Sequence, residues 1–160
     1  MAAGSLISQT AEYALRAVVC LAQHAGEACT TQIVADETHL PQGYLAKVMQ
    51  SLTRAGILQS KRGLHGGFTL ARPPSEISIF DVIDAVDPIR PYVTCPLDFP
   101  WHCETLCPLH RSLDDLIIGF IEQSKRTTIE DILPRDEPKP PPRRRSPRKA
   151  LPRGRRRASR

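Results

Sequence analysis

Apolar side chains in the N-terminal part of the chain recur three and four residues apart, the spacing that places them on one face of an α-helix. A first helix is therefore predicted to begin at Ser8 or Thr10 and to end just before Gly26. Hydroxyl side chains cap helix starts, and glycine favours helix ends. The apolar face of this helix consists of Ala11, Ala14, Leu15, Val18, Leu21 and Ala22.

Two shorter helices are predicted next. Thr30 or Thr31 can cap a helix that ends near Thr38. Proline disfavours helical geometry in the residue before it and is tolerated at a helix start, so Pro41 suits the first turn of a third helix. Gly56 terminates that helix. The apolar face of the third helix consists of Tyr44, Leu45, Val48, Met49 and Leu52.

After Gly56 the hydrophobic pattern changes to that of short strands. Residues 57–60 and 67–71 are predicted to form a hairpin, with the glycine-rich stretch 61–66 at its tip. Three helices followed by a two-stranded hairpin is the element order of a winged helix-turn-helix. The fold class is therefore expected to be mainly α with a small β-hairpin wing, and residues 1–75 to form a DNA-binding domain.

In this fold the third helix enters the major groove of DNA. The residues expected to contact DNA are Gln42, Gly43, Tyr44, Lys47 and Arg54 on this helix and Lys61, Arg62 and His65 on the hairpin. Glutamine can read adenine, lysine and arginine suit guanine or phosphate, and glycine lets the backbone approach the duplex. A basic hairpin tip fits the minor groove. A winged helix that binds protein rather than DNA is the alternative.

The second half of the chain predicts a connecting part and a long helix. Ser78 and Asp81 resemble a capping box that opens a helix through Val86. An irregular segment follows, and Pro108 then begins the longest helix, to about Ser124. Thr128 can cap a last turn over residues 129–133, so residues 76–133 are assigned to this second part.

Charge separates the C-terminal segment from the rest. Residues 134–160 hold 12 Lys and Arg, two acids and seven prolines; the full chain carries +5 and this segment +10, which leaves −5 for residues 1–133. Such a tail is expected to be disordered and to add sequence-independent phosphate contacts. No apolar stretch reaches the roughly 18 residues of a membrane span, and no secretory signal is recognisable, so a cytoplasmic protein is expected.

The chemistry-bearing residues cluster late in the chain. Cys95, Cys103 and Cys107 lie in a proline-rich stretch, and His110 follows the last of them. Thiolates are ligands for zinc and for iron–sulfur clusters, and the spacing leaves both open. Cys20 and Cys29 are expected to be buried or loop residues without a ligand role. No Cys-x-x-Cys motif, Ser/His/Asp set or phosphate-binding loop is present, which argues against an enzyme.

Together these features resemble the Rrf-two family of iron–sulfur winged-helix regulators, typified by IscR and NsrR. The resemblance covers residues 6–133 and is strongest over 8–22, 40–70 and 79–86. It implies a homodimer that binds a DNA operator, with the long helix of each subunit crossing its twin.

The same resemblance implies that the three loop cysteines hold a cluster. His110 matches the position of the fourth ligand in some members of the family. In other members the fourth ligand comes from the partner subunit, and Glu12 matches that position. A 2Fe–2S cluster is favoured over 4Fe–4S, with zinc or no cofactor as the alternative, because some relatives lack the cysteines altogether. The middle cysteine lies later in the loop than in the relatives.

Overall fold

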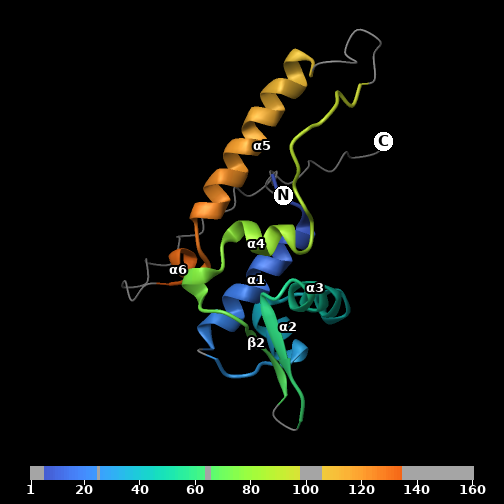
Figure 1. The fold of residues 1–160 in the computed structure, drawn as a ribbon. Coiled ribbons are helices and arrows are strands. Elements are labelled where there is room, and N and C mark those ends of the chain that lie inside the picture. Colours follow the sequence, from blue (N-terminus) through green and yellow to red (C-terminus); the bar gives the residue numbers. More distant parts are fainter. Residues whose placement is uncertain (1–5, 25, 64–65, 98–105, 135–160) are drawn as a thin grey trace, which may run out of the picture.

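The computed structural model describes residues 6–24, 26–63, 66–97 and 106–134. The elements that they form are shown in Figure 1. In chain order these are α1 (Gln9–Gln23), α2 (Thr31–Thr38), α3 (Gln42–Arg54), β1 (Leu58–Lys61), β2 (Gly67–Leu70), the 3-10 helix η1 (Pro74–Glu76), α4 (Ile79–Asp84), α5 (Pro108–Arg126) and α6 (Ile129–Ile132). The mainly helical fold with a two-stranded wing is confirmed.

Helix α1 lies at the centre of the molecule and packs against α2, α3, α4, β2 and α6. The Ser8 side chain caps it by accepting a hydrogen bond from the Ala11 backbone N–H. Ala11, Ala14, Ala17 and Val18 are fully buried, because small side chains on one face let the neighbouring helices approach closely. The periodic face predicted from the sequence is thus the face that forms the core.

The helix-turn-helix is formed by α2 and α3. Thr30 caps α2, and His39 ends it in a left-handed conformation with φ of 56°. Pro41 is the N-cap of α3 rather than a residue of its first turn, so the helix begins one residue later than predicted. Of its predicted apolar face, Leu45, Val48, Met49 and Leu52 are buried, whereas Tyr44 is 41% exposed. The helix packs against α1, α2 and β1, and its polar face is left to solvent.

The wing is an antiparallel hairpin in which Leu58 pairs with Leu70 and Lys61 with Gly67. Cys29 extends it by a backbone bridge to Phe68, with N···O distances of 3.0 and 2.8 Å. A Cβ atom at Gly67 would lie 2.5 Å from the Cys29 carbonyl oxygen, so this strand can approach Cys29 only with glycine at that position. The hairpin is therefore fixed to the loop before α2.

The C-terminal elements return to the same core. Ser78 and Asp81 form the predicted capping box of α4, and Thr128 with Asp131 forms a second one at α6. Ile129 is fully buried, and its N–H donates to the Ile77 carbonyl at 2.8 Å. One hydrophobic core thus joins the helix-turn-helix to η1, α4 and α6.

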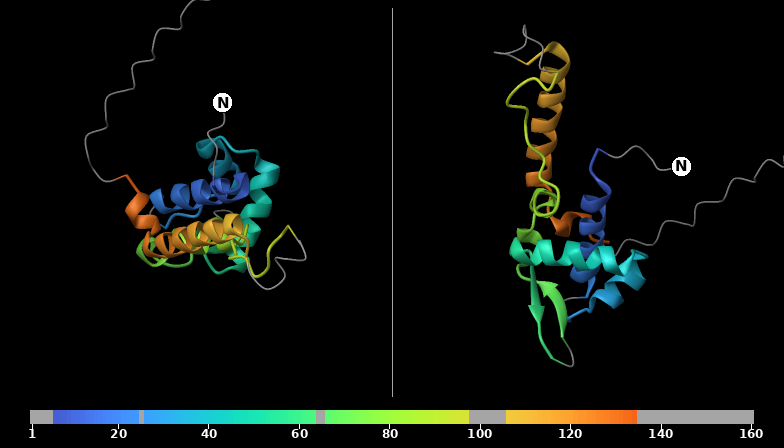
Figure 2. Two further views of the ribbon diagram at one scale, coloured as in Figure 1. Left: turned by 90° about the horizontal axis from the view of Figure 1, so that it is seen from above. Right: turned by 90° about the vertical axis from the view of Figure 1, so that its right-hand side faces the viewer.

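Helix α5 extends away from this body, as the views in Figure 1 and Figure 2 show. It begins at Pro108, as predicted, and of its residues His110 and Ser124 alone are buried. No helix in the described part of the chain is long and apolar enough to cross a membrane. The predicted basic tail lies, after Pro134, outside the described residues.

Candidate functional site

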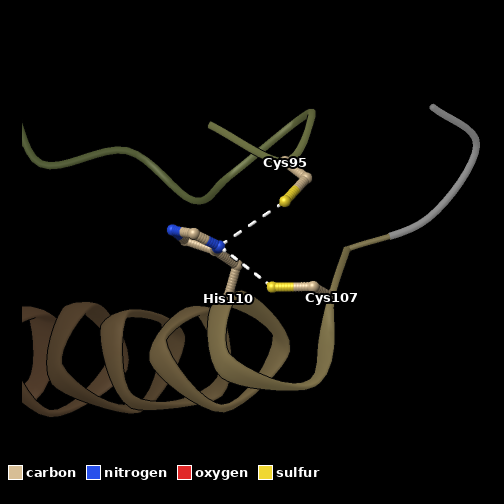
Figure 3. A group of neighbouring side chains, drawn as sticks. All are labelled: Cys95, Cys107 and His110. Carbon is tan, nitrogen blue, oxygen red and sulfur yellow. Dashed lines mark hydrogen bonds between the residues drawn. The ribbon is translucent and has the colours of Figure 1, made fainter. Parts of the chain in front are cut away.

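Three of the predicted ligand residues converge at the far end of α5. His110 Nδ1 lies 3.2 Å from Cys107 Sγ and 3.6 Å from Cys95 Sγ, and the three ligand atoms all lie within 4.8 Å of one another. The three side chains point toward one another in Figure 3. All three residues are buried, although α5 as a whole is exposed. The arrangement is a preformed donor set.

Local structure explains why Cys107 and His110 meet. Cys107 is the N-cap of α5 and Pro108 its first residue, which starts the helix at a fixed position. Residues three apart at a helix start lie on one face, so His110 folds back toward Cys107. The contact between Cys107 and His110 therefore follows from local helix geometry.

Cys95 reaches the site through the loop that follows α4. The Tyr92 backbone N–H donates to the Asp114 carboxylate at 2.7 Å, which fastens this loop to α5. The Tyr92 ring also packs edge-on against His110, with centroids 5.1 Å apart. These two contacts bring Cys95 over the first turn of α5.

The donor set fits a soft or borderline metal. With bond lengths of about 2.3 Å to sulfur and 2.05 Å to nitrogen, two ligands of one tetrahedral zinc ion lie roughly 3.6 Å apart. The two S···N distances of 3.2 and 3.6 Å are close to this value. Cysteine and histidine also ligate iron–sulfur clusters, so the chemistry of the donors suits both groups.

Two further ligands were predicted from the sequence. Cys103 lies outside the described residues, so its position relative to the other cysteines is not described. Glu12 is half-buried on α1 and belongs to neither of the metal-ligand groups formed by the described residues.

A second group of ligand-type side chains was missed by the sequence analysis. The Cys20 thiol donates to Glu37 Oε2 at 3.2 Å, and His24 Nε2 lies 3.0 Å from the same oxygen. Cys20 is buried in the core, as predicted, but its thiol has polar partners. The four-residue spacing of Cys20 and His24 on α1 was a visible signal; the approach of Glu37 from α2 was not.

The electrostatics of this second group are strongly perturbed. Burial, then the hydrogen bond to Glu37 and the nearby negative charges, raise the pKa of Cys20 to about 12. The hydrogen bonds from His24 and Cys20 lower the pKa of Glu37. A neutral thiol and an ionised carboxylate therefore share this site near neutral pH.

The predicted DNA-contacting face is accessible. Seven of the eight residues named for it are exposed, namely Gln42, Gly43, Tyr44, Lys47, Arg54, Lys61 and Arg62. The eighth, His65, lies outside the described residues. Tyr44 has a further role, since its ring packs edge-on against Tyr13 with centroids 5.6 Å apart and its hydroxyl hydrogen-bonds Thr10. It ties the start of α3 to α1.

Gly43 occupies an open position on this face. A Cβ atom added there would meet nothing within 4 Å, so packing within the chain does not demand glycine. Beside α3 the surface is hollowed between the helix and the wing, where Arg54, Gln50 and Ser60 contribute polar groups. Helix α3 and the hairpin thus present one continuous, partly basic surface.

Comparison with known proteins agrees with this reading of the fold. A family model described as Rrf2, iron-dependent transcriptional regulator, matches residues 7–135. A putative HTH-type transcriptional regulator of Aquifex aeolicus (strain VF5) is 32% identical over 132 residues, which cover 80% of this chain and 91% of the relative.

Solved structures share the fold. CymR, the global cysteine regulator of B. subtilis, superposes with a TM-score of 0.65 at 24% identity, covering 80% of this chain and 95% of that one. IscR of T. potens gives a TM-score of 0.64 at 25% identity, covering 80% and 85%. Family members are transcriptional regulators and not enzymes. The chain belongs to the Rrf2 family of DNA-binding transcriptional regulators.

Proposed function

We propose that this regulator binds its operator as a homodimer and that an iron–sulfur cluster on Cys95, Cys107 and His110 sets its affinity for DNA. The convergence of these three buried donors at the start of α5 is the observation that carries the proposal. Cys103, the third cysteine of the loop, is expected to complete the set, and Glu12 of the partner subunit is the alternative to His110. The family description as iron-dependent supports iron over other metals.

DNA recognition uses the face formed by α3 and the wing. Lys47 and Arg54 are exposed on the helix that enters the major groove, and Lys61 and Arg62 lie at the hairpin beside the minor groove. Because residues 1–133 carry a net −5, this local positive face is what distinguishes the DNA-binding side from the rest of the body.

The position of the donor set favours a dimer. Helix α5 has 19 residues, which span roughly 28 Å, and the donor set lies at the end that points away from the winged helix of its own chain. A change at the donor set can affect DNA binding more directly if that end of α5 lies against the partner's winged helix. A homodimer through α5 provides this arrangement.

The surface of α5 supports the same conclusion. Leu116 is 69% exposed and Leu109 59%, and Leu113 and Ile118 are also accessible. Leu113, Leu116 and Phe120 line an apolar hollow together with Tyr92 and Leu6. An apolar stripe of this size on a water-soluble helix indicates an interface, and a second copy of α5 offers a matching stripe.

When bound, the cluster would supply redox- and nitric-oxide-sensitive iron–thiolate bonds. The chain's own residues do the rest: Cys95 is carried by the loop, Cys107 and His110 by α5, and the Tyr92–Asp114 hydrogen bond holds the loop against the helix. If the iron–thiolate bonds were lost, the Tyr92–Asp114 hydrogen bond would remain as one of the main contacts that hold the loop on α5. The position of the loop relative to the partner's α3 is what changes DNA affinity.

A zinc-stabilised regulator is the second candidate, and one observation favours it. The two S···N distances of 3.2 and 3.6 Å are close to the roughly 3.6 Å that separates two ligands of one tetrahedral zinc ion. Binding to two different irons of a cluster would require the donors to move apart.

Metal analysis of anaerobically purified protein separates these candidates. The cluster predicts a coloured protein with iron and acid-labile sulfide in equal amounts, and Cys107→Ser should bleach it. A colourless protein that loses one equivalent of zinc per chain on Cys107→Ser would instead assign zinc to this donor set. Protein with neither metal after anaerobic purification would contradict a metal-controlled regulator of either kind.

A further inference from the structure

The second donor group lies between the end of α1 and helix α2, far from the start of α5. Cys20 and His24 are four residues apart, so both side chains project from the same face of α1 near its end. Glu37 projects from the last turn of α2 toward them. The three ligand atoms lie within 4.8 Å of one another, which makes this the other group among the described residues with metal-binding geometry.

We propose that Cys20, His24 and Glu37 form a zinc site that clamps the end of α1 to α2. One thiolate, one imidazole and one carboxylate are all zinc ligands, and together they carry the two negative charges that neutralise the dication. This site is independent of the donor set on α5 and of the operator-binding mechanism proposed above.

Two of the donor distances need little adjustment to admit the ion. Around a tetrahedral zinc ion, an imidazole nitrogen and a carboxylate oxygen lie roughly 3.4 Å apart, and a thiolate and an oxygen roughly 3.5 Å apart. The corresponding distances here are 3.0 Å for His24–Glu37 and 3.2 Å for Cys20–Glu37. The donors must open by a few tenths of an ångström, and Glu37, on an exposed part of α2, can provide that movement.

Burial makes the site asymmetric. Cys20 is 5% exposed, whereas the side chains of His24 and Glu37 are 28% and 46% exposed. The ion would therefore bind with its thiolate side toward the core and its fourth position toward solvent, where water completes the tetrahedron. On binding, the Cys20 thiol loses its proton to solvent as the zinc–sulfur bond forms.

The position of the clamp gives it a structural consequence. Helix α2 packs against α1 and α3 but contributes two buried residues, Val34 and Ala35, to the core. A zinc bridge would add a cross-link between α1 and this weakly anchored helix. Because α2 supports α3, the clamp would hold the recognition helix in place.

The test uses the full-length chain with the α5 donors removed by Cys95→Ser and Cys107→Ser. Cobalt(II), titrated anaerobically as a spectroscopic stand-in for zinc, should bind with one equivalent per chain and give a thiolate-to-cobalt charge-transfer band. Cys20→Ser should abolish the band. Glu37→Gln should weaken cobalt binding about tenfold or more, as loss of a charged ligand does. Asp36→Asn, one residue away and exposed, is the matched control and should bind like the parent.

Two results would overturn the proposal: no thiolate-to-cobalt band in the parent, or equal affinities for Glu37→Gln and Asp36→Asn. If the parent variant does not fold, zinc content is measured in chains that keep the α5 donors. Cys20→Ser, which removes the thiolate ligand, should then hold one equivalent less zinc than Asp36→Asn, and equal contents would exclude the site. Neither readout depends on the identity of the metal on α5.

Discussion

At the scale of single residues, the metal donors differ in how strongly the fold constrains them. Cys107 and His110 are fixed by the start of α5, and Cys95 by the Tyr92–Asp114 hydrogen bond. Buried thiols and an imidazole that contact one another form a set that a metal can use without paying for a large rearrangement. Substitutions in this set should therefore reduce metal binding much more than a substitution of Glu12.

His110→Ala is expected to reduce the iron content of purified protein to less than about a tenth, because the centre on α5 loses one of its few ligands. Glu12→Gln is expected to retain the metal and to change its visible spectrum little. Iron and zinc analysis, with circular dichroism to verify folding, measures both. The opposite ranking of the two variants would assign the fourth ligand to Glu12 of the partner subunit.

Gly43 is the residue where stability and DNA binding should oppose each other. Gly43→Ala is expected to raise the free energy of unfolding by about 0.5–1 kcal/mol, since alanine favours helices and the position has open space. The added methyl group should weaken operator binding roughly tenfold, or about 1.4 kcal/mol, if the backbone lies against DNA.

Denaturant unfolding and fluorescence anisotropy on operator DNA measure the two effects of Gly43→Ala. A stabilised variant with unchanged affinity would show that α3 does not approach the duplex at this residue.

At this scale the sequence was informative where neighbours along the chain determine which side chains meet. The spacing of Cys107 and His110 at a helix start was visible, and so was the polar face of α3. The approach of Cys95 depends on a loop contact, and that of Glu37 on the packing of α2 against α1. Contacts of this kind arise from tertiary structure, which helical periodicity does not describe.

At the scale of elements, α5 is a helix with an apolar face that its own chain does not cover. Apolar residues recur along it at helical spacing, at Leu109, Leu113, Leu116 and Phe120, yet within one chain these side chains remain at least partly exposed. Capping boxes at α4 and α6 and the glycines of the wing, by contrast, fulfil in the structure the local role that the sequence indicated. The exposed stripe is explained by a partner helix.

Leu116→Glu should convert the dimer to a monomer, because it places a charge in the proposed interface at a position that is 69% exposed in the single chain. The fold of each chain should persist, because Leu116 is not part of the core of the single chain. Sedimentation equilibrium measures the change, with the exposed neighbour Asp115→Asn as the control. A Leu116→Glu protein that stays dimeric would place the interface elsewhere.

At the scale of the whole molecule, charge is distributed unevenly. Residues 134–160 carry +10 and residues 1–133 carry −5, so non-specific attraction to DNA should depend mainly on the tail. The sequence predicted this division directly, because it depends on composition and not on folding. The single core that joins η1, α4 and α6 to the helix-turn-helix was harder to foresee, since its contacts connect Ile77 with the distant Ile129.

Deletion of residues 135–160 should flatten the salt dependence of DNA binding. Each phosphate contact that is lost lowers the steepness of log K against log salt by about 0.9. Binding to unrelated DNA should fall more than binding to operator DNA. Titrations at several salt concentrations on both duplexes measure this, and an unchanged slope would mean that the tail does not contact DNA.

In the proposed mechanism, the donor set on α5 is coupled to the DNA-binding face of α3 and the wing. Operator affinity should be compared, at one salt concentration, between metal-loaded protein and the same preparation after anaerobic removal of the metal. We expect the two dissociation constants to differ by about tenfold or more, within the roughly 1–3 kcal/mol typical of coupled sites. Equal dissociation constants would contradict control of DNA binding by a metal on Cys95, Cys107 and His110.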